Sequence, residues 1–157
     1  MANTGFEQYK IVPLLTSANI GSSTDLDSIN MKGYHKATII YTCGACTGDV
    51  TFTFNSGASN GTKTTAVSFR TAMGGAAIGT ATAGSTASCD VLGATSTETT
   101  KAHTCTTKMV VCEVESAALA SGHSWLTGTV AATAGIVHAV AILWPRYSNY
   151  RSETALA

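Results

Sequence analysis

The sequence has little charge and no excess of either sign. Only 11% of its 157 residues are charged, and 9 Lys and Arg residues balance 9 Asp and Glu residues. Nucleic-acid-binding proteins usually carry clustered cations, whereas the cations here are scattered along the chain from Lys10 to Arg151. We therefore expect no nucleic-acid partner.

Long apolar runs and strong helix formers are also scarce. The longest apolar stretch, residues 130–144, contains His138 and is shorter than the ~20 residues that a membrane-spanning helix needs. The first ten residues include Glu7 and Gln8 and lack the apolar core of a secretory signal. The sequence thus predicts no membrane segment and synthesis in the cytoplasm. It has too few Leu, Glu, Lys and Arg residues for an all-α fold.

Alternation of apolar and polar side chains with a period of two is the clearest pattern present. Val50, Phe52 and Phe54 alternate with threonines, so the three apolar side chains share one face of a strand. We expect Phe52 and Phe54 to lie in the core. Residues 36–42 read as a second strand, and the short glycine-containing segment 43–49 between the two predicts a β-hairpin.

The same periodicity recurs along the rest of the chain. In residues 108–115, we expect the face that carries Val110, Cys112 and Val114 to be buried. A helical signal is confined to residues 115–120. Because no longer helical pattern separates the strands, the sequence predicts an all-β fold, a two-sheet antiparallel sandwich of jelly-roll-like form. The remaining expected strands are residues 10–15, 64–71, 124–130 and 136–144.

Two segments lack this periodicity. Residues 55–63 are rich in Ser, Asn and Gly and predict the loop of a hairpin. Residues 73–107 are too long for a bare loop in a compact domain, so we expect weak strands near residues 88–92 and 102–106. The expected organisation is an N-terminal arm at residues 1–9, a single β-sandwich domain at residues 10–144 and a C-terminal arm at residues 145–157.

The five cysteines include one C-x-x-C pair, Cys43 and Cys46. Two thiolates at this spacing can share a zinc ion, but a tetrahedral site needs two more ligands and no second C-x-x-C exists. His103, Cys105 and Cys112 match no common zinc spacing, so we expect no metal. The thiols are either free, as a reducing compartment favours, or Cys43 is bonded to Cys46. A bridge between Cys105 and Cys112 is the other alternative.

Catalytic motifs are weak. Residues 57–61 match the G-x-S-x-G pattern of a nucleophile elbow, but that motif requires a helix to follow, and a β-like segment follows here. His123 lies at a loop, and His138 is expected to be a core or edge-facing residue of a strand; neither has an acidic partner nearby. Asp25 and Asp27 lack the glycine and glutamate of a calcium loop and are expected to end a strand. We expect no enzyme activity and no cofactor.

A family resemblance rests on the order of several short segments that together cover most of the chain. They are IVPLL at residues 11–15, INMKGY at 29–34, ATII at 37–40, GDVTFT at 48–53, VCEVE at 111–115, AVAIL at 139–143 and PRY at 145–147. In this layout the chain resembles the capsid decoration or cement proteins of tailed bacteriophages and related virion components. It departs from them at the C-x-x-C pair and in the Ala, Thr and Gly-rich segment after Met73.

The resemblance implies a mechanical function without an active site. Such proteins look like β-sandwiches or jelly rolls that sit on the capsid exterior, often as trimers, and clamp neighbouring capsid subunits. The implied partners are the major capsid protein and other copies of the chain, after synthesis in the host bacterial cytoplasm. Tyr and Arg are enriched at binding centres, so we expect the arms to make contacts. The expected contact residues are Phe6, Tyr9, Arg146, Tyr147, Tyr150 and Arg151.

Two other functions remain open. A carbohydrate-binding or adhesin module is also a β-sandwich, and it would need an exposed aromatic platform built from Tyr34, Trp125 or the C-terminal arm. A tail or head-fibre component of the virion is the second alternative.

Overall fold

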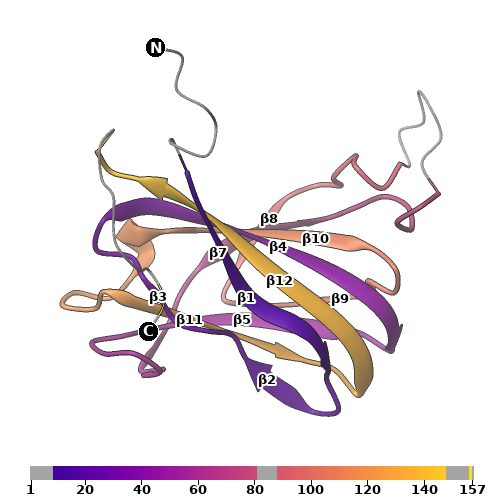
Figure 1. Cartoon of the computed structure of the whole chain (residues 1–157), viewed down its shortest axis with the longest axis horizontal. Coiled ribbons are helices and arrows are strands. Elements are labelled where there is room, and N and C mark those ends of the chain that lie inside the picture. Colours follow the sequence, from indigo (N-terminus) through magenta and orange to yellow (C-terminus); the bar gives the residue numbers. More distant parts are fainter. Residues whose placement is uncertain (1–8, 81–87, 148–155, 157) are drawn as a thin grey trace.

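The chain folds into two antiparallel β-sheets that pack face to face (Figure 1), which confirms the predicted all-β sandwich. The computed structural model describes residues 9–80, 88–147 and 156. Sheet A contains, in spatial order, β1 (Lys10–Asn19), β12 (Ala134–Pro145), β4 (Tyr34–Thr47), β10 (Met109–Glu115), β7 (Phe69–Met73) and β8 (Ser96–Glu98). Sheet B contains β2 (Ser23–Asp25), β11 (Trp125–Ala131), β5 (Val50–Gly57) and β6 (Thr65–Ala66), with β3 (Ile29–Asn30) on β11 and β9 (Thr100–His103) on β5.

The core lies between the sheets, where the alternating pattern places its apolar side chains. Phe52 and Phe54 of β5 are buried, and the Val110, Cys112 and Val114 face of β10 is buried opposite them, as predicted. Hydrophobic burial on this inner face is the main source of stability for a sandwich.

Gly128 of β11 allows close packing within this core. A Cβ atom at this position would lie 2.7 Å from Leu26 Cδ1 and 2.9 Å from Phe54 Cε1. These distances are too short for a side chain, so the glycine leaves the space that the Phe54 ring and Leu26 fill.

The segment at residues 43–49 does not form the predicted hairpin. β4 continues to Thr47 and pairs with β12 and β10 in sheet A, whereas β5 pairs with β11 in sheet B. The chain crosses between the sheets at Gly48, whose φ of 75° suits glycine. The prediction was wrong because alternation shows which face of a strand is apolar but not which strand lies beside it.

The strand predicted at residues 64–71 is two strands in different sheets. β6 pairs with β5 in sheet B, and β7 pairs with β10 in sheet A. Val67 lies at the crossing, where it is buried and donates its backbone N–H to the Phe54 carbonyl. β5 and β6 do form the hairpin predicted around residues 55–63.

The long segment after Met73 contains short strands, and β9 overlaps the strand predicted near residues 102–106, whereas no strand forms at residues 88–92. β8 and β9 occupy residues 96–103, and Leu92 makes only an isolated bridge to Gly74. The Ala, Thr and Gly-rich sequence carries no periodicity that marks where pairing occurs, because its few contacts are made with distant strands.

The helical signal at residues 115–120 corresponds to one 3₁₀ turn, Ser116–Ala118, that connects β10 to β11. Asp25 ends β2, as expected. Within the described ranges, no helix has the length and hydropathy needed to cross a membrane.

Candidate functional site

The outer face of sheet A carries an apolar row that crosses five neighbouring strands. Each residue of the row lies directly beside the next in the strand register, so the side chains point to the same face. The row consists of Pro13 of β1, Val140 of β12, Ile40 of β4, Val111 of β10 and Ala72 of β7.

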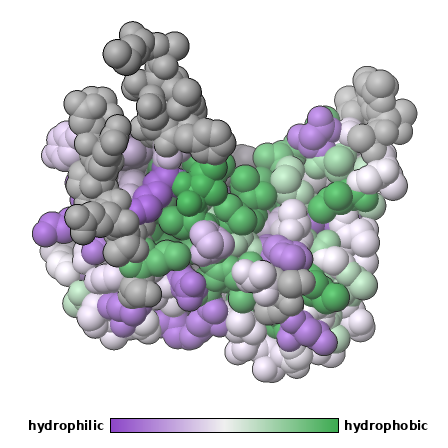
Figure 2. All heavy atoms as spheres, viewed as in Figure 1, coloured by the Kyte–Doolittle hydropathy of each residue, from purple (hydrophilic) through white to green (hydrophobic). Residues whose placement is uncertain are grey.

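The β1 and β12 end of this row is exposed. Ile11 is 52% exposed, Ile136 42% and Val140 37%. Figure 2 shows hydrophobic residues gathered over β1 and β12 on the side that faces the viewer. We name the group formed by Ile11, Pro13, Ile40, Val111, Ile136, Val140 and Ile142 the apolar face.

The sequence of β12 explains why this surface is unusual. Antiparallel strands with one solvated face normally alternate, whereas a nearly continuous apolar strand is typical of burial on both faces. Residues 134–145 form such a nearly continuous apolar run, yet only Val137, Ala139 and the other inner-face residues of the strand are buried. Exposed apolar patches of this kind mark interaction sites.

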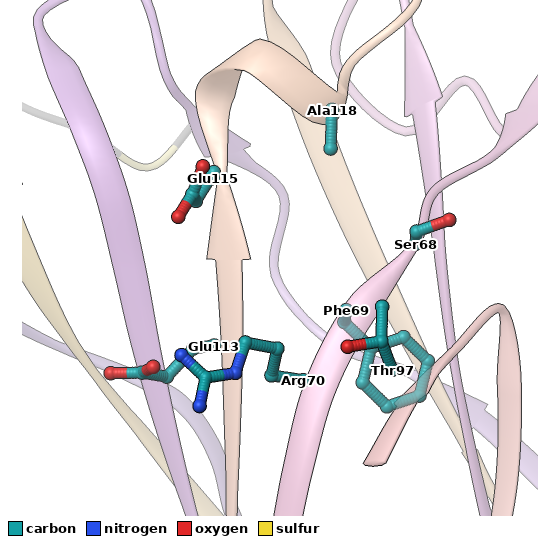
Figure 3. A pocket seen from close by; sticks show the side chains of 7 residues that line it. All are labelled: Ser68, Phe69, Arg70, Thr97, Glu113, Glu115 and Ala118. Carbon is teal, nitrogen blue, oxygen red and sulfur yellow. The ribbon is translucent and has the colours of Figure 1, made fainter. Parts of the chain in front are cut away.

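The β10 and β7 end of the same face is hollowed and charged. Two neighbouring hollows of about 250 and 180 Å³ lie there, and Arg70 and Glu113 line both. Figure 3 shows Arg70 on β7 with its guanidinium turned toward Glu113 on β10. Glu113 forms an ion pair with Lys36 at 2.9 Å, whereas Arg70 takes part in none of the ion pairs of the described residues. The exposed Arg70 suits an acidic or carbonyl group of a partner.

The structure places some of the sequence-predicted contact residues. Tyr9 packs edge-on against Trp144, with ring centroids 4.5 Å apart. Arg146 is exposed but anchored, because it donates from Nε to the Tyr34 carbonyl at 3.1 Å and from Nη2 to Ser116 Oγ at 2.8 Å. Tyr147 is 71% exposed. Phe6, Tyr150 and Arg151 lie outside the described residues.

These positions bring Tyr9 and Arg146 to the same end of β12, beside the apolar face. Sequence reasoning placed the contact surface on the arms and did not identify the apolar face. The sequence did contain a signal for the apolar face. Residues 136–144 lose the alternation of apolar and polar side chains, because outward and inward positions are both apolar.

A serine–histidine contact is present that the sequence did not suggest. Ser56 Oγ lies 2.9 Å from His123 Nδ1 and 3.4 Å from the Thr65 carbonyl, and it accepts the Ala120 N–H. Ser56 is fully buried, so no substrate reaches its hydroxyl. The contact therefore fastens the loop before β11 to β5 and does not form a catalytic dyad.

Two other histidines, His138 and His103, lie on strands of the sandwich. His138 is exposed on the outer face of β12, so its assignment to the core was wrong; β12 alternates in burial and His138 has the outward parity. His103 contacts Thr71 Oγ1 at 3.1 Å, and burial lowers the pKa of its imidazole.

The cysteines are arranged differently from either disulfide considered. All five are free, and Cys105 lies beside Cys43, with their sulfur atoms 2.8 Å apart. Cys112 instead contacts Thr71 Oγ1, and burial raises the pKa of its thiol to about 12. Among the residues that the structure describes, no three His, Cys, Asp or Glu side chains are placed to hold a metal ion.

The aromatic platform needed for carbohydrate binding loses one of its candidates. Tyr34 is buried, so its ring is not available at the surface, and Trp125 is only partly exposed. No protein-family model, curated protein or solved structure matches the chain.

Proposed function

We propose that the chain is a structural protein of a tailed-bacteriophage virion that binds the outside of the assembled capsid. It stabilises the shell by bridging neighbouring capsid subunits. Its partners are the major capsid protein and further copies of itself, assembled as a homotrimer. Its place is the capsid exterior, after synthesis in the bacterial cytoplasm.

The apolar face is the observation that carries this proposal. Ile11, Ile136 and Val140 leave apolar area in water, and covering such area contributes about 25 cal/mol per Å² before the costs of association. A protein surface with matching apolar side chains is the partner that recovers this free energy. Arg70 at the far end of the same sheet supplies a charged contact that sets the orientation.

The balanced charge of the chain also favours a protein partner. A net charge of zero provides no attraction for nucleic acid or anionic surfaces. A subunit that binds only the assembled shell stabilises that shell by mass action, and a trimer that contacts several capsid chains gains from effective concentration. The segment order described above resembles that of decoration proteins, and this resemblance supports the proposal.

Electron microscopy of particles from the phage that encodes the chain tests the proposal. We expect copies spread over the whole shell at local three-fold positions. Copies confined to the tail or to head fibres would contradict the capsid assignment and favour the fibre alternative. Binding of the isolated protein to glycans, with none to capsids, would instead support an adhesin.

A further inference from the structure

Three thiols converge at the end of the sandwich where β4 passes into β5. Residues three apart on a regular strand point to opposite faces, so Cys43 and Cys46 would normally diverge. Here Cys43 lies beside Val137 and Cys46 beside Gly135, so three steps of β4 oppose two steps of β12. This β-bulge turns both cysteines to the inner face.

Gly135 makes room for the second of these thiols. A Cβ atom on Gly135 would lie 2.7 Å from Cys46 Sγ, so any side chain at this position would displace the sulfur. The Cys46 thiol faces the Ile136 carbonyl at 4.0 Å, and it is close enough to Cys43 and Cys105 to shift the pKa of each.

The loop between β9 and β10 carries the third thiol and is fastened to β4. Thr107 donates its N–H to the Gly44 carbonyl at 2.9 Å, and Thr106 Oγ1 donates to the Cys46 carbonyl at 2.7 Å. Thr107 has a φ of 56°, a left-handed conformation that is uncommon for threonine. These contacts hold Cys105 Sγ 2.8 Å from Cys43 Sγ.

The three thiols differ in access and in acidity. Cys43 is 2% exposed and Cys105 is fully buried, whereas Cys46 is partly exposed. The hydrogen bond between the buried pair lowers the pKa of Cys105 and raises the pKa of Cys43, because it stabilises the Cys105 thiolate. Burial raises the pKa of Cys46, so this thiol is the first to react because of its access to solvent and not because of its acidity. A partly exposed thiol, an acidic thiol and a third thiol in contact are the groups that thiol–disulfide exchange requires.

We propose that Cys43 and Cys105 form an intramolecular disulfide when the protein meets a small disulfide oxidant such as oxidised glutathione, with Cys46 as the entry thiol. This inference goes beyond the proposed function and does not depend on it. The product would connect β4 of sheet A to the loop that follows β9 of sheet B.

The chemistry proceeds by three exchanges. The Cys46 thiolate attacks one sulfur of oxidised glutathione, whose S–S bond breaks and releases one glutathione thiolate. The Cys105 thiolate attacks the Cys46 sulfur, forms a Cys46–Cys105 bond and expels the second glutathione. The Cys43 thiolate then attacks Cys105, and Cys46 leaves as a thiolate. Two protein thiols become one disulfide, and both protons and both electrons pass to two glutathione molecules.

Peptide mapping of the full-length protein tests this chemistry. The reduced, folded protein is incubated with oxidised glutathione, alkylated and digested with trypsin. Cys105 falls in residues 102–108, while Cys43 and Cys46 fall in residues 37–63. We expect these two peptides to be joined through Cys43. Absence of the link, a link through Cys46, or glutathione left on Cys46 as the final product would overturn the proposal.

Three variants separate the roles of the thiols. Cys43→Ala should abolish the Cys43–Cys105 link, and Cys46→Ala should form the same link about tenfold more slowly. Reaction of Cys46→Ala at the wild-type rate would overturn the role of Cys46 as entry thiol. Cys112→Ala is the matched control, because this buried thiol contacts Thr71 and neither Cys43 nor Cys105. In this variant the Cys43–Cys105 link should form at the wild-type rate. The mapping of the wild-type protein decides the question even if a variant fails to fold.

Discussion

The outer faces of the two sheets differ in chemistry although their inner faces are alike. On sheet B, Thr51 and Thr53 of β5 point outward, and Thr53 lies beside Thr129 of β11. Thr129 donates to Asp25 at 2.7 Å, and Lys63 forms an ion pair with the same carboxylate. The contacts from Thr129 and Lys63 satisfy the Asp25 carboxylate.

On β1 and β12 of sheet A the equivalent outward positions are mostly apolar, with Ile11, Ile136 and Val140 exposed and His138 the polar exception on β12. Both sheets contribute to one core, so the core does not require this apolar surface. The difference is that the outer face of sheet B is polar, whereas the outer face of sheet A leaves apolar side chains exposed, which is the surface that the proposed function assigns to a partner.

Truncation of a core side chain should have the largest effect on stability, and truncation of a side chain on the apolar face should have a much smaller one. Phe54→Ala on sheet B should lower the free energy of unfolding by about 3–5 kcal/mol, because it leaves a cavity beside Phe69, whose ring centroid lies 4.9 Å away. Ile136→Ala on the apolar face should cost less than about 1 kcal/mol. Guanidinium unfolding measures both. Equal losses would show that Ile136 supports the fold rather than a partner.

An added charge should weaken capsid binding on the outer face of sheet A and leave it nearly unchanged on the outer face of sheet B. Val140→Lys should weaken binding to capsids by ~30-fold or more, as expected for a central contact worth about 2 kcal/mol. Thr53→Lys places the same charge at an outward position of a central strand of sheet B and should leave binding within about twofold. Co-sedimentation with purified particles measures both variants. An equal loss in both would remove the distinction between the faces.

Buried hydroxyls also differ between the sheets. The Tyr41 hydroxyl on sheet A has no hydrogen-bond partner among the described residues, so Tyr41→Phe should stabilise the protein by about 1 kcal/mol. Thr127 on sheet B contacts Ser28 Oγ at 2.7 Å, and Thr127→Val should cost about 1–3 kcal/mol. Thermal unfolding of the two variants should give shifts of opposite sign. A loss in Tyr41→Phe would reveal a partner for its hydroxyl.

The ion pair on sheet B should have the smallest effect, through pH. The hydrogen bond from Lys63 lowers the pKa of Asp25 below its ordinary value of 3.8. Stability from this pair is therefore present above that value and is lost as pH falls through the lower folded-state pKa. At neutral pH, Asp25→Asn should cost at most about 1 kcal/mol, because the pair is exposed.

Unfolding midpoints measured from neutral to acid pH check this expectation. Asp27→Asn removes the same charge from a neighbouring exposed residue that lacks the Lys63 and Thr129 contacts, and it serves as the control. A cost of Asp25→Asn that persists at the lowest pH would show that the ion pair is not its source.

Burial within a strand could be predicted from the sequence, but pairing between strands could not. The buried faces of Val50, Phe52 and Phe54 follow from alternation, which is a property of adjacent residues. The hairpin at residues 43–49 failed because β4 pairs with β12, about ninety residues further along the chain. The same limit hid the contact between Cys43 and Cys105, which are 62 residues apart.

The sequence by itself determined an all-β chain with balanced charge and with apolar faces set by a period of two. Only the tertiary structure decided which strands lie side by side, and therefore which outward side chains join into one surface. The apolar face is formed by β1, β12, β4 and β10, drawn from both ends and the middle of the chain. Periodicity orients a side chain locally, whereas a surface depends on long-range pairing that the chain reaches by folding.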